Sequence, residues 1–115
     1  MTMRMSQQAV VWMVLTLAAA LVAQSTDASL SGSVLDPAGA VIGGAKVTIT
    51  NKTTGGSRVV IANDAGTFIA AGLPPGTYRV TAEQPGFKTW VLDSLTLDVG
   101  AQQSISIVLQ VGQTA

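Results

Sequence analysis

The chain contains no cysteine and no histidine. The first absence excludes disulfide bonds, thiol nucleophiles and thiolate metal ligands. The second excludes imidazole ligands and the commonest general base of enzymes. Aromatic residues make up only 4% of the chain, so few large side chains are available to fill a core or to stack on a ligand. Few routes to catalysis or to a metal site are left.

Charged residues are also scarce, at 10% of the 115 residues, and six basic residues balance six acidic ones. A neutral chain of this kind lacks the electrostatic footprint of a nucleic-acid-binding protein. Glu83 is the sole glutamate and has no second carboxylate near it in the sequence, so paired-carboxylate hydrolysis has little support. We predict that the protein is not an enzyme, has no catalytic residues, holds no cofactor and binds no nucleic acid.

The aspartates are the remaining candidate ligands for a hard cation: Asp36, Asp64, Asp93 and Asp98. Calcium loops gather several carboxylate or amide oxygens within about a dozen residues. Here only Asn63 and Asp64 are adjacent in a turn, and capping of that turn explains the pair better. No metal site is predicted.

The N-terminal segment has the three parts of a secretory signal peptide. Arg4 is the only charge before Asp27, an apolar run covers residues 9–22, and a small-residue exit follows at residues 23–25. The run is shorter than the about 20 residues that span a bilayer, and a core helix fits poorly with a chain that lacks helical periodicity. We predict a helical signal peptide over 1–25, with cleavage after Ser25. The mature chain, without a membrane span, is then exported to the periplasm, the outer membrane or the extracellular space.

From Leu30 onward, apolar and polar residues alternate with a period of two. Between residues 45 and 50, for example, alanine, valine and isoleucine alternate with lysine and threonine. Successive side chains of a strand point to opposite faces, so each such run predicts a strand with one face in a core and one in water. Seven strands are predicted, at residues 30–36, 45–51, 57–62, 67–71, 77–83, 103–110 and, as one broken strand, 88–92 with 95–99.

Glycine, proline, asparagine and aspartate separate these runs at short intervals. Residues 36–39, Asp-Pro-Ala-Gly, suit a type I turn. Residues 73–76, Leu-Pro-Pro-Gly, end a strand, because proline cannot donate into a ladder. So many short strands in about 80 residues predict an all-β fold, a seven-stranded antiparallel β-sandwich with Greek-key connections. The predicted domain covers residues 26–111, and a tail follows at 112–115.

A longer pattern resembles a known family. Its parts are Gly32-Ser33-Val34, Asp36-x-x-Gly39, Gly44-Ala45-x-Val47-x-Ile49, Asp64-x-Gly66-x-Phe68, Leu73-x-Pro75-Gly76-x-Tyr78-x-Val80 and Gly86-Phe87. The pattern covers nearly all of residues 30–109 and resembles the carboxypeptidase regulatory-like domain, a transthyretin-like β-sandwich often grouped with carbohydrate-binding-like folds. The resemblance implies an accessory domain without peptidase chemistry.

The chain has a predicted signal peptide, then one such module, then a final Leu109-x-Val111-Gly112. This arrangement resembles that of a narrower group of proteins. That group is the N-terminal extension of TonB-dependent outer-membrane receptors. A receptor barrel needs many strands of about 10 residues each, which 115 residues cannot supply after a sandwich is built. The expectation is a free-standing module or a shortened receptor, associated with the cell envelope.

Trp90 is the only tryptophan outside the predicted signal peptide, and it is the single candidate for ligand binding. An exposed tryptophan can stack on a sugar ring or anchor a partner protein. The alternative is that Trp90 closes one end of the core. Tyr78 begins a strand with inward parity, so we assign its ring to the core and its hydroxyl to a backbone acceptor.

Two functions from different classes fit the sequence. The first is an exported interaction module that docks on another envelope protein through an apolar patch or an unpaired strand edge. The second is a carbohydrate-binding module that uses Trp90. Sugar binding needs an exposed aromatic platform with polar groups nearby, whereas docking needs only the patch or the edge. The first is the prediction and the second is its alternative.

Overall fold

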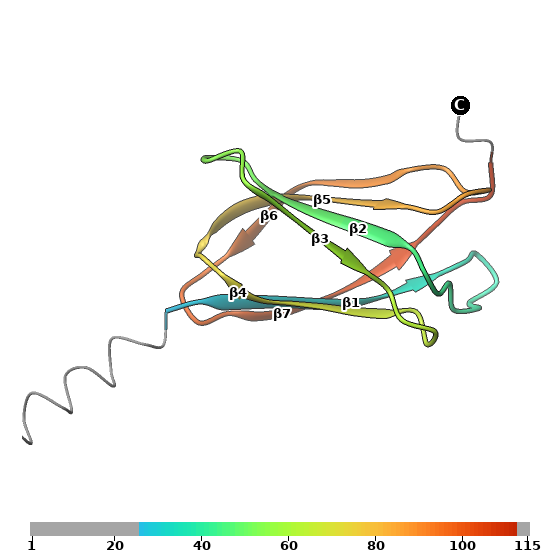
Figure 1. Ribbon diagram of the computed structural model, residues 1–115, viewed down its shortest axis with the longest axis horizontal. Coiled ribbons are helices and arrows are strands. Elements are labelled where there is room, and N and C mark those ends of the chain that lie inside the picture. The colour runs from blue at the N-terminus through green and yellow to red at the C-terminus, as the bar shows by residue number, and fades with distance from the viewer. Residues whose placement is uncertain (1–25, 113–115) are drawn as a thin grey trace, which may run out of the picture.

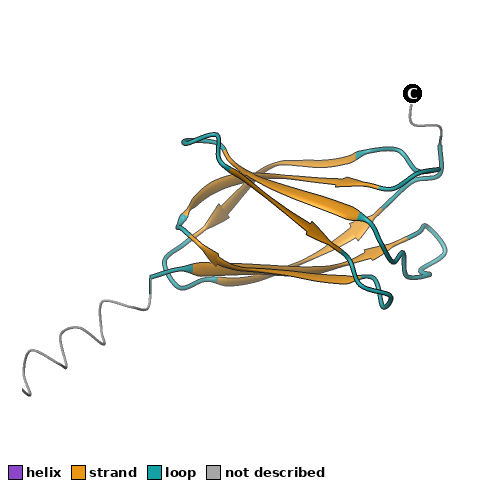
Figure 2. Cartoon of the chain, in the orientation of Figure 1, coloured by secondary structure: helices purple, strands orange, loops and turns teal. Residues whose placement is uncertain are grey.

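The computed structural model describes residues 26–112, and every regular element in that range is a β-strand (Figure 1; Figure 2). The strands are β1 (Ala28–Leu35), β2 (Lys46–Asn51), β3 (Ser57–Ile61), β4 (Thr67–Leu73), β5 (Gly76–Glu83), β6 (Trp90–Leu97) and β7 (Gln102–Val108). No helix long and apolar enough to cross a membrane occurs in this range. The predicted signal peptide at 1–25 and residues 113–115 of the predicted tail lie outside the described residues.

The strands form two sheets that pack face to face (Figure 1). One sheet has the order β4-β1-β7 and the other the order β3-β2-β5-β6. The alternation correctly identified Val47, Ile49, Val80 and Ile107 as inward positions, since all four are buried. Val99, at the end of the predicted 95–99 run, lies beyond β6 and is 67% exposed. Between residues 26 and 112 no polar or charged residue is buried. The predicted all-β sandwich is confirmed.

One strand pair differs from the predicted antiparallel arrangement. β1 and β7 run parallel, with Leu30 opposite Gln103 and Val34 opposite Ile107, whereas the other strand pairs are antiparallel. The chain leaves β6 in the four-stranded sheet and crosses to the three-stranded sheet, which it enters in the direction of β1. Alternation indicates which side chains face the core, but it carries no information about strand direction.

β6 is one continuous strand, which corrects the predicted break after residue 92. The irregularity there is a bulge. Tyr78 pairs with Leu95 and Val80 with Leu92, so Arg79 of β5 faces two residues of β6. An extra residue on one strand shifts the register while the chain stays extended.

A second bulge lies between β1 and β4. The register shifts between Ala28 and Leu30, because β4 carries one extra residue at Ala71 and Gly72. Gly72 has a φ of 70°, a left-handed conformation that glycine adopts without a steric penalty. The bulge extends β4 to Leu73, two residues beyond the predicted end of this strand.

Gly32, in the middle of β1, makes room for the largest side chain of its sheet. It lies opposite Phe68 of β4. A Cβ at Gly32 would lie 2.7 Å from Cζ of the Phe68 ring and 2.5 Å from the carbonyl oxygen of Ile105. The Phe68 ring, 5% exposed, therefore occupies the space that a side chain on β1 would need.

We expect Gly32→Ala to destabilise the fold by about 1–3 kcal/mol, because a methyl group there overpacks the core against the Phe68 ring and a backbone carbonyl. Urea unfolding followed by circular dichroism measures the change. Gly56→Ala is the matched control, since the nearest atom to its added Cβ is 3.4 Å away and its φ is not positive. The control is expected to change stability by no more than about 0.5 kcal/mol. Equal losses for the two variants would contradict the packing argument.

Candidate functional site

Trp90 begins β6 and lies opposite the buried Ala82 of β5. Paired residues of neighbouring strands share a face of the sheet, so the indole is directed toward the interior, where it is half-buried against the core. Among the other aromatic side chains of residues 26–112, Phe68 and Tyr78 are buried and Phe87 is half-buried against the core. The described part of the chain thus presents no fully exposed aromatic platform, and ligand binding through Trp90 stays a prediction.

The acidic residues do not converge. Within residues 26–112, no group of three or more His, Cys, Asp or Glu side chains is placed to hold a metal ion. The Asp36 carboxylate accepts hydrogen bonds from the backbone N–H groups of Ala38 and Ala40, each at 2.9 Å. Asn63 caps the turn before β4 in the same way. Turn capping accounts for both, and it was predicted for the turn at Asn63.

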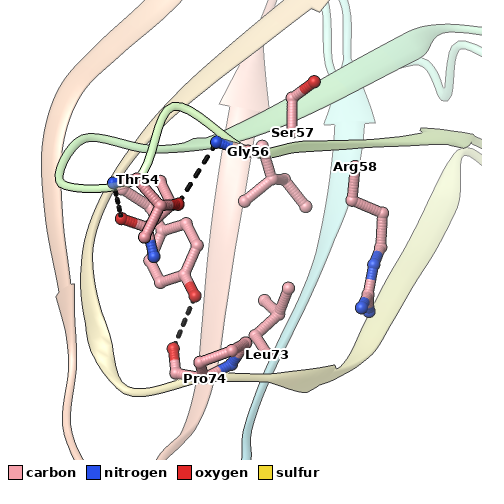
Figure 3. Close-up of a pocket in the computed structure, with 9 residues that line it drawn as sticks. Thr54, Gly56, Ser57, Arg58, Leu73 and Pro74 are labelled. Carbon is pink, nitrogen blue, oxygen red and sulfur yellow. Dashed lines mark hydrogen bonds between the residues drawn. The ribbon is translucent and has the colours of Figure 1, made fainter.

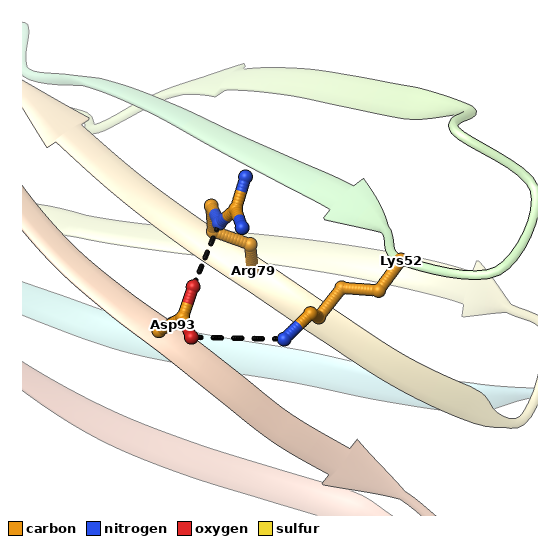
Figure 4. A network of polar contacts seen from close by, with 3 residues as sticks. All are labelled: Lys52, Arg79 and Asp93. Atoms are coloured by element: carbon orange, nitrogen blue, oxygen red, sulfur yellow. Dashed lines mark hydrogen bonds and ion pairs between the residues drawn. The ribbon is translucent and has the colours of Figure 1, made fainter.

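Asp93 forms the one cluster of charged side chains that the described residues contain, on the outer face of the four-stranded sheet (Figure 4). One carboxylate oxygen accepts a hydrogen bond from Arg79 Nε at 3.0 Å, and the other lies 3.7 Å from Lys52 Nζ. The bulge in β6 places Asp93 opposite Arg79. The hydrogen bond from Arg79, followed by the charges of Lys52 and Arg79, lowers the pKa of Asp93. The carboxyl group is well exposed, so the cluster contributes little to stability.

Several large apolar side chains are exposed where the edges of the two sheets approach each other, at β3 and β4. Ile61 and Ile69 are 60% and 68% exposed, and Val59 is 50% exposed. A groove of about 570 Å³ lies between the two strands, and its walls include Val60 and Phe68. We call this region the β3–β4 side.

β3 has a free backbone edge on this side, because it is the last strand of its sheet. Hydrogen-bonded and non-bonded residue pairs alternate along an antiparallel ladder. The bond from the Ala62 N–H group to the Ala45 carbonyl oxygen, 2.9 Å long, fixes that alternation for β3. Ser57, Val59 and Ile61 therefore direct their N–H and C=O groups away from β2 and toward solvent.

Arg58 connects the two sheets across the β3–β4 side. It lies opposite the buried Ile49, so its side chain points from β3 toward the other sheet (Figure 3). Its guanidinium donates hydrogen bonds to the carbonyl oxygens of Ala71 and Gly72, the bulged residues of β4. The bulge provides the acceptors, and the arginine links strands that share no ladder.

A pocket of about 200 Å³ lies next to Arg58, between the β2–β3 hairpin and the β4–β5 turn (Figure 3). Tyr78 forms part of its wall, and the Tyr78 hydroxyl donates a hydrogen bond to the carbonyl oxygen of Pro74. The ring is 3% exposed. The predicted core position of Tyr78 and the backbone acceptor for its hydroxyl are confirmed.

The chain matches the family model of the carboxypeptidase regulatory-like domain over residues 29–110. It belongs to this family. The family name denotes a regulatory domain rather than a catalytic one, and the match supports the resemblance drawn from the glycine, proline and aromatic pattern. A search of curated proteins gives no significant match.

Solved structures share the fold of this carboxypeptidase regulatory-like domain. The Bacillus anthracis TIE protein superposes with a TM-score of 0.64 and 21% identity, over 75% of this chain and 17% of that one. A putative carbohydrate binding protein from Bacteroides uniformis gives 0.61 and 19%, over 73% and 41%. Catechol 1,2-dioxygenase from Pseudomonas arvilla gives 0.61 and 13%, over 79% and 54%. The chain spans about half or less of each of these proteins, and at such identities the likeness concerns the fold alone.

Neither β3 nor Arg58 was predicted as a site from the sequence. The sequence did contain one indication of an apolar edge. Val59, Val60 and Ile61 are three consecutive apolar residues, whereas strict alternation would place polar residues at the outward positions 59 and 61. The Arg58 contact had no local signal, since its partners lie 13 and 14 residues away at a bulge.

We expect Tyr78→Phe to destabilise the domain by about 1 kcal/mol, the usual net value of one intramolecular hydrogen bond. The ring stays in place, so the change reports the bond to Pro74 alone. Chemical denaturation with an unchanged m-value would measure it. A variant as stable as the wild type would show that the hydroxyl bond contributes nothing.

The Asp93 carboxyl group is expected to titrate below the usual aspartate pKa of about 3.9. A lowered pKa in the folded state adds stability above the pKa of the unfolded chain, and this contribution is lost as the pH falls through the folded pKa. Arg79→Gln should move the NMR titration midpoint of Asp93 upward, whereas Arg58→Gln should leave it unchanged. A midpoint indifferent to Arg79→Gln would remove Arg79 as the main cause.

Proposed function

We propose that the domain is a non-catalytic accessory module, exported to the cell envelope, that docks on another envelope protein. The signal-peptide pattern supports export, and the family match supports an accessory role. The similarity to the N-terminal extensions of TonB-dependent receptors favours a partner in that receptor system. Final placement in the periplasm, at the outer membrane or outside the cell is part of the same proposal.

The free edge of β3 carries the proposal. Exposed edge strands are normally guarded by proline, lysine, a bulge or a covering segment. β3 contains neither proline nor lysine and pairs with β2 without a bulge. Its single charge, on Arg58, is directed toward β4.

The occupant that fits this edge is an extended strand of the partner protein. Ser57, Val59 and Ile61 offer unpaired backbone groups at alternate positions, which another strand can bond as a fifth member of the sheet. The outer face of β3 carries no charged side chain, because Arg58 is directed inward, and Val59 and Ile61 lie beside the new strand on that face. We therefore expect an uncharged segment rich in β-branched residues.

Carbohydrate binding remains the alternative function. One structural neighbour is named a putative carbohydrate binding protein, at 19% identity, and such a likeness of fold is a weak basis for assigning function. Trp90 is the residue that would carry this activity, and its half-buried indole offers less stacking surface than an exposed ring. The β3 edge favours protein docking.

A photo-crosslinking residue at Ser57, introduced into the full chain in its own host, tests the proposal. We expect one envelope protein to be crosslinked, and Val59→Lys to reduce the yield at least about tenfold, because a lysine guards an edge against pairing. Val91→Lys is the control. Val59 pairs with Thr48, Thr48 with Thr81, and Thr81 with Val91, so Val91 occupies the corresponding position on the outer face at the opposite edge of the sheet. The two valines are similarly exposed, at 54% for Val91 and 50% for Val59.

Equal yields for the two lysine variants would exclude the β3 edge, and no crosslinked protein in the envelope would contradict docking altogether. Sedimentation of the purified wild-type chain separates a third outcome. Self-association that Val59→Lys abolishes would make a second copy the occupant, and the proposed envelope partner would then be wrong.

A further inference from the structure

The pocket beside Arg58 combines an apolar wall with a single cationic group. Ile49, Leu73 and Pro74 supply apolar surface, and Arg58 supplies the charge. Figure 3 shows Thr54 and Arg58 on opposite sides of the pocket, with Leu73 and Pro74 along the β4–β5 turn. No aspartate or glutamate is among the residues that line it.

The positive charge of Arg58 is not neutralised by the contacts it makes. A guanidinium carries five N–H donors, and its two hydrogen bonds here go to neutral carbonyl oxygens of β4. Among residues 26–112, the ion pairs involve Lys52, Arg79 and Asp93 but not Arg58. Arg58 thus has donors and charge to offer to an anionic ligand.

Asn51 adds a second donor to the same pocket. Its side-chain oxygen accepts hydrogen bonds from the N–H groups of Thr53 and Thr54, at 2.9 Å and 3.1 Å. That assignment leaves the amide NH₂ group as the free end of the side chain, and it donates to no residue in the described range. A guanidinium and an amide NH₂ group together favour a ligand that accepts hydrogen bonds and carries negative charge.

The backbone N–H groups of residues 53–56 in the β2–β3 hairpin already have hydrogen-bond acceptors within the hairpin. The N–H groups of Thr53 and Thr54 bond to the Asn51 side chain, that of Gly55 to the Asn51 carbonyl oxygen, and that of Gly56 to Thr54 Oγ1. Capture of a phosphate or of a peptide C-terminus relies on clustered free backbone N–H groups. The Ser57 hydroxyl points away from the pocket (Figure 3). Recognition therefore falls to the side chains of Arg58 and Asn51.

The pocket is also too apolar for a bare ion and too small for a long ligand. Its volume of about 200 Å³ lies below the range of about 300–1,000 Å³ typical of drug-sized ligands. The apolar surfaces of Leu73 and Pro74 suit the flat side of one ring. These features together select a single ring that carries a carboxylate.

We propose that this pocket binds a small ring-shaped organic carboxylate, with the carboxylate on Arg58, the ring against Leu73 and Pro74, and the Asn51 amide group facing the ligand from the Thr54 side of the pocket. Two sources share this chemistry, a uronic acid residue of an acidic polysaccharide and an aromatic acid. The site goes beyond the proposed docking function and does not depend on it, because docking uses the backbone edge of β3 rather than this pocket.

Titration of the ¹⁵N-labelled chain with glucuronate, benzoate, acetate and glucose tests the proposal by amide chemical shifts. We expect at least one of the two ring carboxylates to shift the amides of Thr54, Gly55 and Gly56 in a saturable way. Acetate lacks the ring and glucose lacks the charge, so both should bind at least about tenfold more weakly. Whichever ring carboxylate binds more tightly identifies the source.

Asn51→Asp is the decisive variant. It keeps the oxygen that caps the hairpin but replaces the NH₂ donor with a negative charge, so we expect a loss of affinity of at least about tenfold without unfolding. Asn63→Asp makes the same change at another turn-capping asparagine and should leave binding unchanged. Arg58→Lys keeps the charge but loses the planar fork, and intermediate affinity is expected.

Three results would overturn the proposal. One is equal affinity for glucuronate and glucose, which would mean that the carboxylate is not recognised. Another is wild-type affinity of Asn51→Asp in a folded protein. The third is the absence of saturable shifts near the hairpin with both ring carboxylates.

Discussion

The two sheets hold together because each buries one apolar face against the other, and the rest of the structure depends on keeping polar groups out of that interface. Leu30, Val34, Val80 and Ile107 have no exposed surface. Burial of apolar area stabilises by about 25 cal/mol per Å², whereas an unpaired polar group in the same place costs more than one such side chain contributes. The alternation of apolar and polar residues along most of the strands satisfies both conditions at once.

The same constraint determines where the molecule can interact. Two sheets that pack only through their inner faces leave open edges, and backbone groups at an edge lack partners in the ladder. At the far edge of the four-stranded sheet, β6 carries a bulge and the charged Asp93. β3 has no bulge and no charged side chain on its outer face. Its only charged residue, Arg58, instead links β3 to the bulge of β4. One side of the sandwich is therefore guarded and the other is left available.

The sequence allowed all seven strands to be predicted, and the buried face of those with a clear alternation, because side-chain direction is a local property of an extended chain. Val47 and Ile49 were assigned to the core on alternation alone, and the Tyr78 ring and hydroxyl were placed correctly from its position after Gly76. The parallel pairing of β1 with β7 and the continuity of β6 were not predicted. The first depends on pairing between strands far apart in the chain, and the second on a bulge, which leaves no periodic trace in the sequence.

The candidate site was less predictable than the fold for the same reason. Trp90 attracted attention as an isolated aromatic residue, yet its indole faces inward. Arg58 gave no local signal, because its environment is created by a hairpin, a turn and a bulge from three parts of the chain. Composition indicated correctly that any site would have to be built without thiols or imidazoles, but it could not indicate where.

β3 presents an unpaired backbone edge to solvent. Amide hydrogen exchange in the isolated protein, resolved residue by residue by NMR, tests it most directly. We expect an alternating pattern, with fast exchange at Ser57, Val59 and Ile61 and slow exchange at Arg58 and Val60, which bond to β2. Uniform protection along β3 would contradict it, because the edge would then already be covered.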